Sequence, residues 1–131
     1  MHTLSVRTTS RMEMADITVR IQELVRASGI DAGVCHLFVA HTTAGLTINE
    51  NADPHVQADI LMVLNKIISE REAYRHLEGN SPAHIKASLM GPQLTVLVEQ
   101  GRLVLGTWQG IFLCEFDGPR TRKVHIKMMA G

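Results

Sequence analysis

The sequence has no long apolar run, no excess of charge of either sign and almost no cysteine. No stretch approaches the ~20 consecutive apolar residues that a membrane-spanning helix needs, so we expect no membrane partner. Thirteen basic side chains balance thirteen acidic ones, which leaves no surplus positive charge to neutralise a phosphate backbone. Nucleic-acid binding is therefore disfavoured. The N-terminus lacks the basic stretch and apolar run of a signal peptide, which predicts a cytoplasmic protein.

The only cysteines, Cys35 and Cys114, are set among apolar neighbours. Because no secretion signal precedes them, we expect two buried free thiols rather than a disulfide. The chain is 45% hydrophobic and 20% charged, a composition that folds. It has no internal repeat, low-complexity tract or linker, so residues 1–131 are predicted to form a single domain.

Three segments have the pattern of helices. Apolar residues at helical spacing follow Asp16 and end at Gly29. Asp53 and Pro54 form a typical helix start before an apolar stripe over residues 56–68. A short helix is predicted to begin at Ser81-Pro82, with Ser81 as its cap, and to end at Gly91-Pro92.

The remaining segments predict strands at residues 4–8, 34–40, 46–49, 94–99, 103–106, 111–117 and 122–129, with a further glycine-bounded segment at 107–110. Two strands, helices and then a run of adjacent strands favour an α+β domain. We expect a mostly antiparallel β-sheet or sandwich with two to three helices packed on one face.

Three of the seven histidines, His41, His76 and His84, are predicted to lie at the ends of separate elements. Three imidazoles that converge from such ends resemble a catalytic zinc site, where one position stays open for water or substrate. The spacing itself matches no metal motif, so the alternative stays open that His76 caps helix carbonyls and His84 is a surface residue. His36 is left out because a strand would point it away from His41.

Polar side chains crowd the segment before the second predicted helix, where Asn49, Glu50, Asn51 and Asp53 fall within five positions. A helix cap needs only one or two of them, so the surplus favours a site. Glu50 is the preferred proton-transfer residue, and Asp53 is a cap that also serves the site.

Two arginines closely follow two carboxylates near the C-terminus. The period of a strand directs Cys114 and Phe116 toward the core and places Glu115 and Asp117 on the other face. Arg120 and Arg122 come just after the Gly118-Pro119 turn. They either clamp these carboxylates and brace the turn, or present a guanidinium to a phosphate.

Three more polar residues have two interpretations each. Lys86 and Ser88 follow Asn80 on the short helix, where they meet an anionic ligand or form a solvated face. Gln109 stands next to Trp108 between two glycines. This arrangement lets the backbone approach a ligand, or it is a kink between strands with Trp108 filling the core.

Long polar runs of this chain resemble the YjbQ-type family. The runs are HTTAGLTINENADP at 41–54, GN at 79–80, AHIKAS at 83–88, GRL at 101–103, LGTWQGI at 105–111 and EFDGPR at 115–120. The chain departs from the family pattern at Ser81-Pro82, where a polar and often acidic pair is expected, and at Gln93 and Leu97.

The resemblance implies a small α+β fold that assembles as a homotrimer, with polar residues near the subunit boundary and a divalent metal held by histidines. Zinc is the first expectation and magnesium the second. It also implies a secondary thiamine-phosphate synthase activity, which joins a pyrimidine pyrophosphate to a thiazole phosphate with loss of pyrophosphate. Glu115 and Asp117 are among the motif positions that carry over.

The sequence thus predicts a metal-binding enzyme that acts on a phosphorylated small molecule. Metal ligands are His41, His76 and His84, and catalytic residues are Glu50 and Asp53. Substrate-binding residues are Thr42, Asn49, Asn80, Lys86, Ser88, Gln109 and Arg120. Lys86 and Arg120 are expected to help neutralise pyrophosphate. The alternatives are a non-catalytic trimeric protein that binds metal and a small ligand, and a hydrolase that uses metal-activated water.

Overall fold

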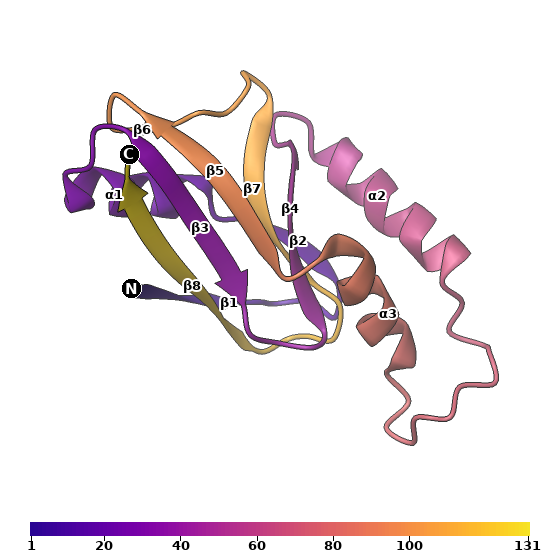
Figure 1. Cartoon of the computed structure of the whole chain (residues 1–131). Coiled ribbons are helices and arrows are strands. Elements are labelled where there is room, and N and C mark those ends of the chain that lie inside the picture. The colour runs from indigo at the N-terminus through magenta and orange to yellow at the C-terminus, as the bar shows by residue number, and fades with distance from the viewer.

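A computed structural model describes all residues from 1 to 131. The chain forms eight strands and three helices (Figure 1). In chain order these are β1 (His2–Arg7), β2 (Glu13–Asp16), α1 (Thr18–Ser28), β3 (Gly33–Val39), β4 (Ala44–Glu50), α2 (Pro54–Ile67), α3 (Ser81–Met90), β5 (Gln93–Glu99), β6 (Arg102–Leu103), β7 (Gln109–Glu115) and β8 (Thr121–Ala130). None of the helices is long and apolar enough to cross a membrane.

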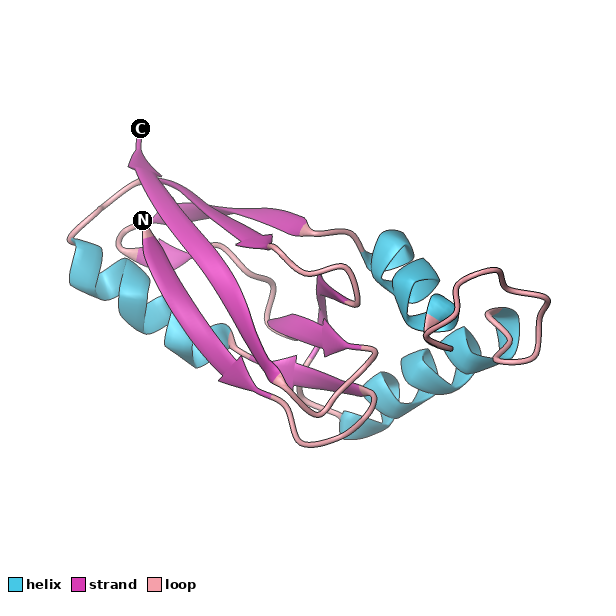
Figure 2. Cartoon of the chain, turned by 90° about the horizontal axis from the view of Figure 1, so that it is seen from below, coloured by secondary structure: helices cyan, strands magenta, loops and turns pink.

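The strands form two curled sheets in which every pairing is antiparallel. One sheet has the order β1-β8-β3-β5-β6, and the other has the order β2-β7-β4. The α+β class is therefore confirmed. Helix α1 lies on the opposite side of the molecule from α2 and α3 (Figures 1 and 2), so the expectation that all helices share one face is wrong.

The main hydrophobic core joins the two sheets and α1. Alternate residues of each strand point into it, as Cys35, Leu37 and Val39 do from β3. Helix α1 adds Ile21 and Val25, which are fully buried. Burial of each such side chain contributes about 1.5–3 kcal/mol, so this core holds the sheets together.

Helices α2 and α3 cover the outer face of the small sheet. Phe112, Cys114 and Phe116 of the β7 segment pack there with Leu64 of α2 and Ala87 of α3. Strand β7 is therefore buried on both faces. The prediction that Glu115 lies away from the core is wrong, because that face of β7 is the one turned toward the main core.

The element boundaries agree with the sequence in most places. Asp53 caps α2 as predicted, since its side chain accepts a hydrogen bond of 2.9 Å from the His55 N–H. Both cysteines are unpaired and buried, as expected. Strand β2 was not predicted, and the strand expected at 103–106 is only the two-residue β6. The residue that precedes α3 is Asn80 rather than Ser81, and its side chain makes no cap hydrogen bond.

Helix α3 packs closely on β4 where Gly45 stands. A Cβ atom there would lie 2.9 Å from both the Gly91 oxygen and the Met90 Cβ. Real Cβ contacts are longer than this, so the backbone of α3 would have to move. The hydrogen at Gly45 thus fixes how near α3 comes to the small sheet.

Gly45→Ala is expected to lower the free energy of unfolding by about 1–3 kcal/mol through overpacking. Thermal unfolding measures the loss. Gly106→Ala is the matched control, because its Cβ would meet only the flexible side chain of Gln109, at 3.3 Å. Equal losses in the two variants would contradict the role assigned to Gly45.

Candidate functional site

Polar residues from three separate segments line a cavity at one end of the small sheet. The segments are the β3–β4 loop, the α2–α3 loop with the first turn of α3, and the β7–β8 turn. The lining residues are Thr42, Thr43, His76, Glu78, Asn80, His84, Asp117 and Arg120. This space of about 290 Å³, which we call the polar cavity, has no apolar side chain in its wall.

His76 and His84 lie next to each other in the polar cavity. Their ring centroids are 5.3 Å apart, and the rings meet edge to face. His84 comes from the first turns of α3, whereas His76 comes from the loop before it. The Glu78 carboxylate lies 3.8 Å from His76 Nε2. The predicted convergence of these two histidines is thus present in the structure.

His41 lies in a second cavity of about 290 Å³, which shares Thr42 and His84 with the first. Its Nε2 accepts a hydrogen bond of 3.0 Å from the backbone N–H of Lys123. Burial, together with the positive charge of Arg122, lowers the pKa of His41 below its usual 6.5. The ring is therefore neutral at pH 7, and because Nε2 accepts this hydrogen bond, the ring proton is on Nδ1, which is a donor.

The three histidines are neighbours, but in the single chain no three His, Cys, Asp or Glu side chains form a group that could hold a metal ion. One buried atom nevertheless favours a cation. Asn80 Oδ1 is buried without a hydrogen-bond partner, and Asn80 lines the polar cavity with His76 and His84. Imidazole nitrogens together with an unpartnered oxygen suit a divalent metal, so these residues fit such an ion.

A fully buried ion pair lies beneath the polar cavity. Glu115 and Arg122 have 0% and 2% of their side-chain surface exposed. Arg122 Nε donates to both carboxylate oxygens of Glu115, at 2.9 and 3.1 Å. Burial alone would raise the pKa of Glu115, but hydrogen bonds from Arg122, Thr8 and the Asp117 N–H outweigh it and hold the pKa below 4.5.

This ion pair positions the walls of the polar cavity. Arg122 Nη2 donates to Thr43 Oγ1 at 2.7 Å, and Glu115 accepts from the Asp117 N–H at 3.1 Å. Thr8 donates to Glu115 at 2.8 Å and also accepts from the Arg120 N–H at 2.9 Å. Three lining residues on two segments are therefore tied to the same buried pair.

The prediction that the two arginines clamp the two carboxylates is confirmed. The two arginines differ, however, in how exposed they are. Arg122 is buried, so it presents nothing to a phosphate. Arg120 is about half exposed, and its Nε and Nη2 donate to the oxygens of Asp117 at 2.8 and 3.2 Å. The other N–H groups of Arg120 remain free to bind an anion at the polar cavity.

Lys86 does not reach either cavity, which corrects its prediction as an anion-binding residue. Its side chain is 1% exposed, and its Nζ donates to Asn65 Oδ1 at 2.7 Å. Burial lowers its pKa, although Glu70 at 3.8 Å opposes this effect. Lys86 therefore fastens α3 to α2. Ser88 does line the second cavity, as predicted.

Four predicted residues lie at the far end of β4: Asn49, Glu50, Asp53 and Gln109. The seven residues of β4 place Glu50 roughly 20 Å from Ala44, at about 3.3 Å per residue. Glu50 pairs with Gln109 of β7, and the Asn49 side chain accepts from the Glu50 N–H at 2.8 Å. Within one chain, the structure does not bring the predicted catalytic residues to the histidines.

Sequence reasoning also missed several lining residues. Thr43 and Glu78 line the polar cavity, and Ala44, Ala87 and Pro92 line the second one. Thr43 stands next to Thr42 in the long polar run, which is a signal that could have marked it. The small residues give no such signal, because they contribute space rather than a reactive group.

Comparison with known proteins agrees with this α+β fold. The model of the family described as "UPF0047 protein YjbQ-like" matches residues 2–131. The chain belongs to this family.

Its relatives cover nearly the same length. UPF0047 protein YugU of Bacillus subtilis (strain 168) is 52% identical over 97% of each chain. A crystal structure of an uncharacterized YjbQ/UPF0047 family protein from Clostridium acetobutylicum has 50% identity and a TM-score of 0.96, covering 98% of this chain and 100% of its own. A YbjQ-like protein of unknown function from Sulfolobus solfataricus has 34% identity and a TM-score of 0.94, covering 99% and 96%.

Arg122→Met is expected to lower the free energy of unfolding by about 3–5 kcal/mol, because it leaves the Glu115 carboxylate buried without a positive charge beside it. The exposed pair of Arg120 and Asp117 provides the control, since Arg120→Met removes a contact that contributes about 1 kcal/mol or less to stability. Denaturant unfolding measures both. Similar losses in the two variants would contradict the importance of the buried pair.

The Glu115–Arg122 pair also makes the free energy of unfolding depend on pH. Because the folded pKa of Glu115 lies below its ordinary 4.5, the stabilisation is complete above that pH. It is lost as the pH falls through the lower folded value. A double variant, Glu115→Leu with Arg122→Met, should lack this part of the acid unfolding.

Proposed function

We propose that this protein is a metal-dependent enzyme that acts on a phosphorylated small molecule. The observation that carries the proposal is the polar cavity, which is lined by two adjacent histidines and by Asn80, whose Oδ1 is buried without a hydrogen-bond partner. His76 and His84 would hold the metal, with His41 as the third ligand after its Nε2 has released the Lys123 N–H. Nitrogen ligands favour zinc, and magnesium is the alternative.

Arg120 supports a phosphorylated ligand. Its contacts with Asp117 orient the guanidinium and leave N–H groups that can donate to phosphate oxygens. Thr42 and Thr43 add two hydroxyl groups to the same wall. When bound, a divalent cation would neutralise negative charge on the phosphate groups. The chain's own residues would bind and orient the ligand.

A secondary thiamine-phosphate synthase activity belongs to the proposal because the family resemblance implies it. The reaction expels pyrophosphate, so it needs donors and positive charge around the leaving group. The polar cavity offers Arg120 and the paired histidines for this purpose. A cytoplasmic location is also proposed, and the two unpaired, buried cysteines are in keeping with it.

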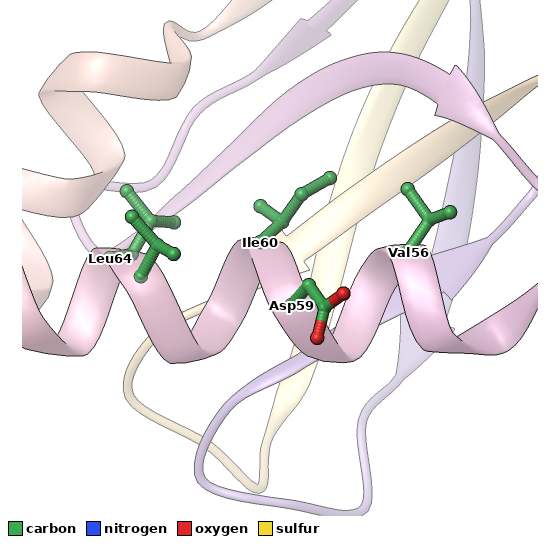
Figure 3. A pocket seen from close by; sticks show the side chains of 5 residues that line it. Val56, Asp59, Ile60 and Leu64 are labelled. Atoms are coloured by element: carbon green, nitrogen blue, oxygen red, sulfur yellow. The ribbon is translucent and has the colours of Figure 1, made fainter.

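We also propose that the chain works as a homotrimer. The single chain exposes 7736 Å², whereas a compact monomer of 14.5 kDa exposes about 6,900 Å². Helix α2 accounts for part of the difference. An open groove runs along it past Val56, Ile60 and Leu64, with Asp59 at its edge (Figure 3). Val63 and Ile67 on this helix are 47% and 66% exposed.

Assembly would also explain the distant carboxylates. Glu50 and Asp53 lie at the other end of β4 from the histidines, so they can serve the polar cavity only if another subunit supplies them. We therefore place the complete site between subunits, with Glu50 in proton transfer.

The metal proposal is tested on protein purified without chelator. Native protein should contain about one zinc per chain and should form thiamine phosphate from the pyrimidine pyrophosphate and the thiazole phosphate. His84→Ala should lose both, because it removes the ligand shared by the two cavities. Metal is measured by mass spectrometry and product by chromatography.

His36→Gln is the matched control, because His36 bonds to Thr95 on the large sheet and lines neither cavity. Metal content that is the same in the native protein and in His84→Ala would overturn the metal site. Metal binding without any turnover would instead favour the non-catalytic carrier.

The assembly is tested by sedimentation equilibrium. Native protein should have three times the mass of one chain, and Val63→Glu with Ile67→Asp should dissociate it, since charges would enter an apolar contact. Val19→Asp is the control, on an exposed position of α1. A native monomer, or a trimer that survives the α2 substitutions, would refute this face as the contact.

A further inference from the structure

The outer face of the large sheet is open to solvent. Its inner face forms part of the main core, and none of the three helices covers the outer one (Figures 1 and 2). Strands β1, β3 and β8 contain no aspartate or glutamate, although the whole chain has thirteen acidic residues. The balance of charge over the whole chain therefore does not hold on this face, where basic side chains predominate.

Two exposed lysines flank a pair of rings on this face. Lys123, His125 and Lys127 alternate with the buried residues of β8, so all three point outward. Phe38 of β3 lies directly opposite His125 in the register. We call these four residues the basic sheet face. The two lysines are roughly 13 Å apart along the strand, at about 3.3 Å per residue, and neither forms an ion pair.

The two rings of the basic sheet face are open to a partner. Phe38 is 46% exposed, whereas Phe112 and Phe116 are buried. A hydrogen bond of 3.1 Å between its Nδ1 and Thr3 Oγ1 holds the His125 ring in place. Exposed aromatic and histidine rings on a sheet are surfaces on which unpaired bases stack, and basic side chains beside them bind the phosphates. A single strand is favoured, because the bases of a duplex are already stacked on one another.

Hydroxyl groups beside the lysines favour RNA over DNA. Ser5 of β1 lies opposite Lys123, and Thr121 precedes Lys123 by two residues on the same face of β8. Both side chains are exposed. A hydroxyl group can donate to and accept from a ribose 2′-hydroxyl, which DNA lacks.

We infer that the basic sheet face binds single-stranded RNA without sequence preference. Lys123 and Lys127 contact two phosphates of one strand, and the bases between them stack on Phe38 and His125. This face shares no residue with either cavity, so the inference does not depend on the proposed function.

The test measures the binding of fluorescein-labelled probes by fluorescence anisotropy. Native protein should bind octauridylate with a Kd of roughly 1–100 µM at physiological salt, the range for binding without sequence preference. Octadeoxyuridylate should bind about threefold more weakly, because it lacks the 2′-hydroxyls. A peptide of eight glutamates should bind at least about tenfold more weakly, because it has charge but no bases to stack.

Two variants separate stacking from charge. Phe38→Leu should weaken RNA binding about tenfold and leave its salt dependence unchanged, because stacking releases no counterion. Lys127→Ala should reduce the slope of log affinity against log salt by about 0.7, since one phosphate contact is lost. Trp108→Leu and Arg26→Ala are the matched controls, because they remove an exposed ring and an exposed charge outside this face. Both controls should retain the native affinity and slope.

Three results would overturn the inference. The first is that octauridylate does not bind, or binds no more tightly than the deoxy probe or the peptide. The second is native affinity in Phe38→Leu together with a native salt slope in Lys127→Ala. The third is binding that is lost in Arg120→Met but kept in Phe38→Leu, which would place the RNA at the polar cavity instead.

Discussion

The buried contact between Glu115 and Arg122 is the interaction on which the cavities depend. Two charges inside a core are costly to desolvate, and they are tolerated only where their hydrogen bonds are satisfied. Here the bonds that satisfy them come from Thr8 at the end of β1, Thr43 in the β3–β4 loop and the Asp117 backbone. The same bonds therefore stabilise the pair and bring three distant segments of the chain to one place.

Much of the fold could be predicted from the period of apolar residues. The Asp53-Pro54 start and the stripe that follows define α2, alternation defines β8, and a continuous apolar run predicts β3. Strand β2 was missed because four residues of mixed polarity have no clear period, and they become a strand only by pairing with β7. The burial of both faces of β7 was also missed. Glu115 in an otherwise apolar run suggests a solvent-exposed face until its buried partner Arg122 is known.

The site was predictable in part, for a geometric reason. His76, Asn80 and His84 are close in sequence and stay close in space, so the prediction that the two histidines lie at the ends of neighbouring elements was enough to bring them together. Thr42 and Glu50 are just as close in sequence, yet β4 runs between them and carries Glu50 to the other end of the sheet. The prediction that Lys86 binds an anion was wrong for a similar reason, since nothing in its local sequence reveals that α2 covers its side chain. Family resemblance marked all of these residues without indicating which ones meet.

One contact of His41 extends the large sheet in an unusual way. Strand β3 ends at Val39, which pairs with Val124, and the next N–H toward the start of β8 belongs to Lys123. The imidazole of His41 receives that N–H, so a side chain takes the place of the backbone carbonyl that a longer β3 would have provided. A residue that lines the second cavity thus accepts the last hydrogen bond at this end of the large sheet. Protonation of this nitrogen, or rotation of the ring toward a ligand, would break that hydrogen bond, so a ligand in the second cavity would act directly on the start of β8.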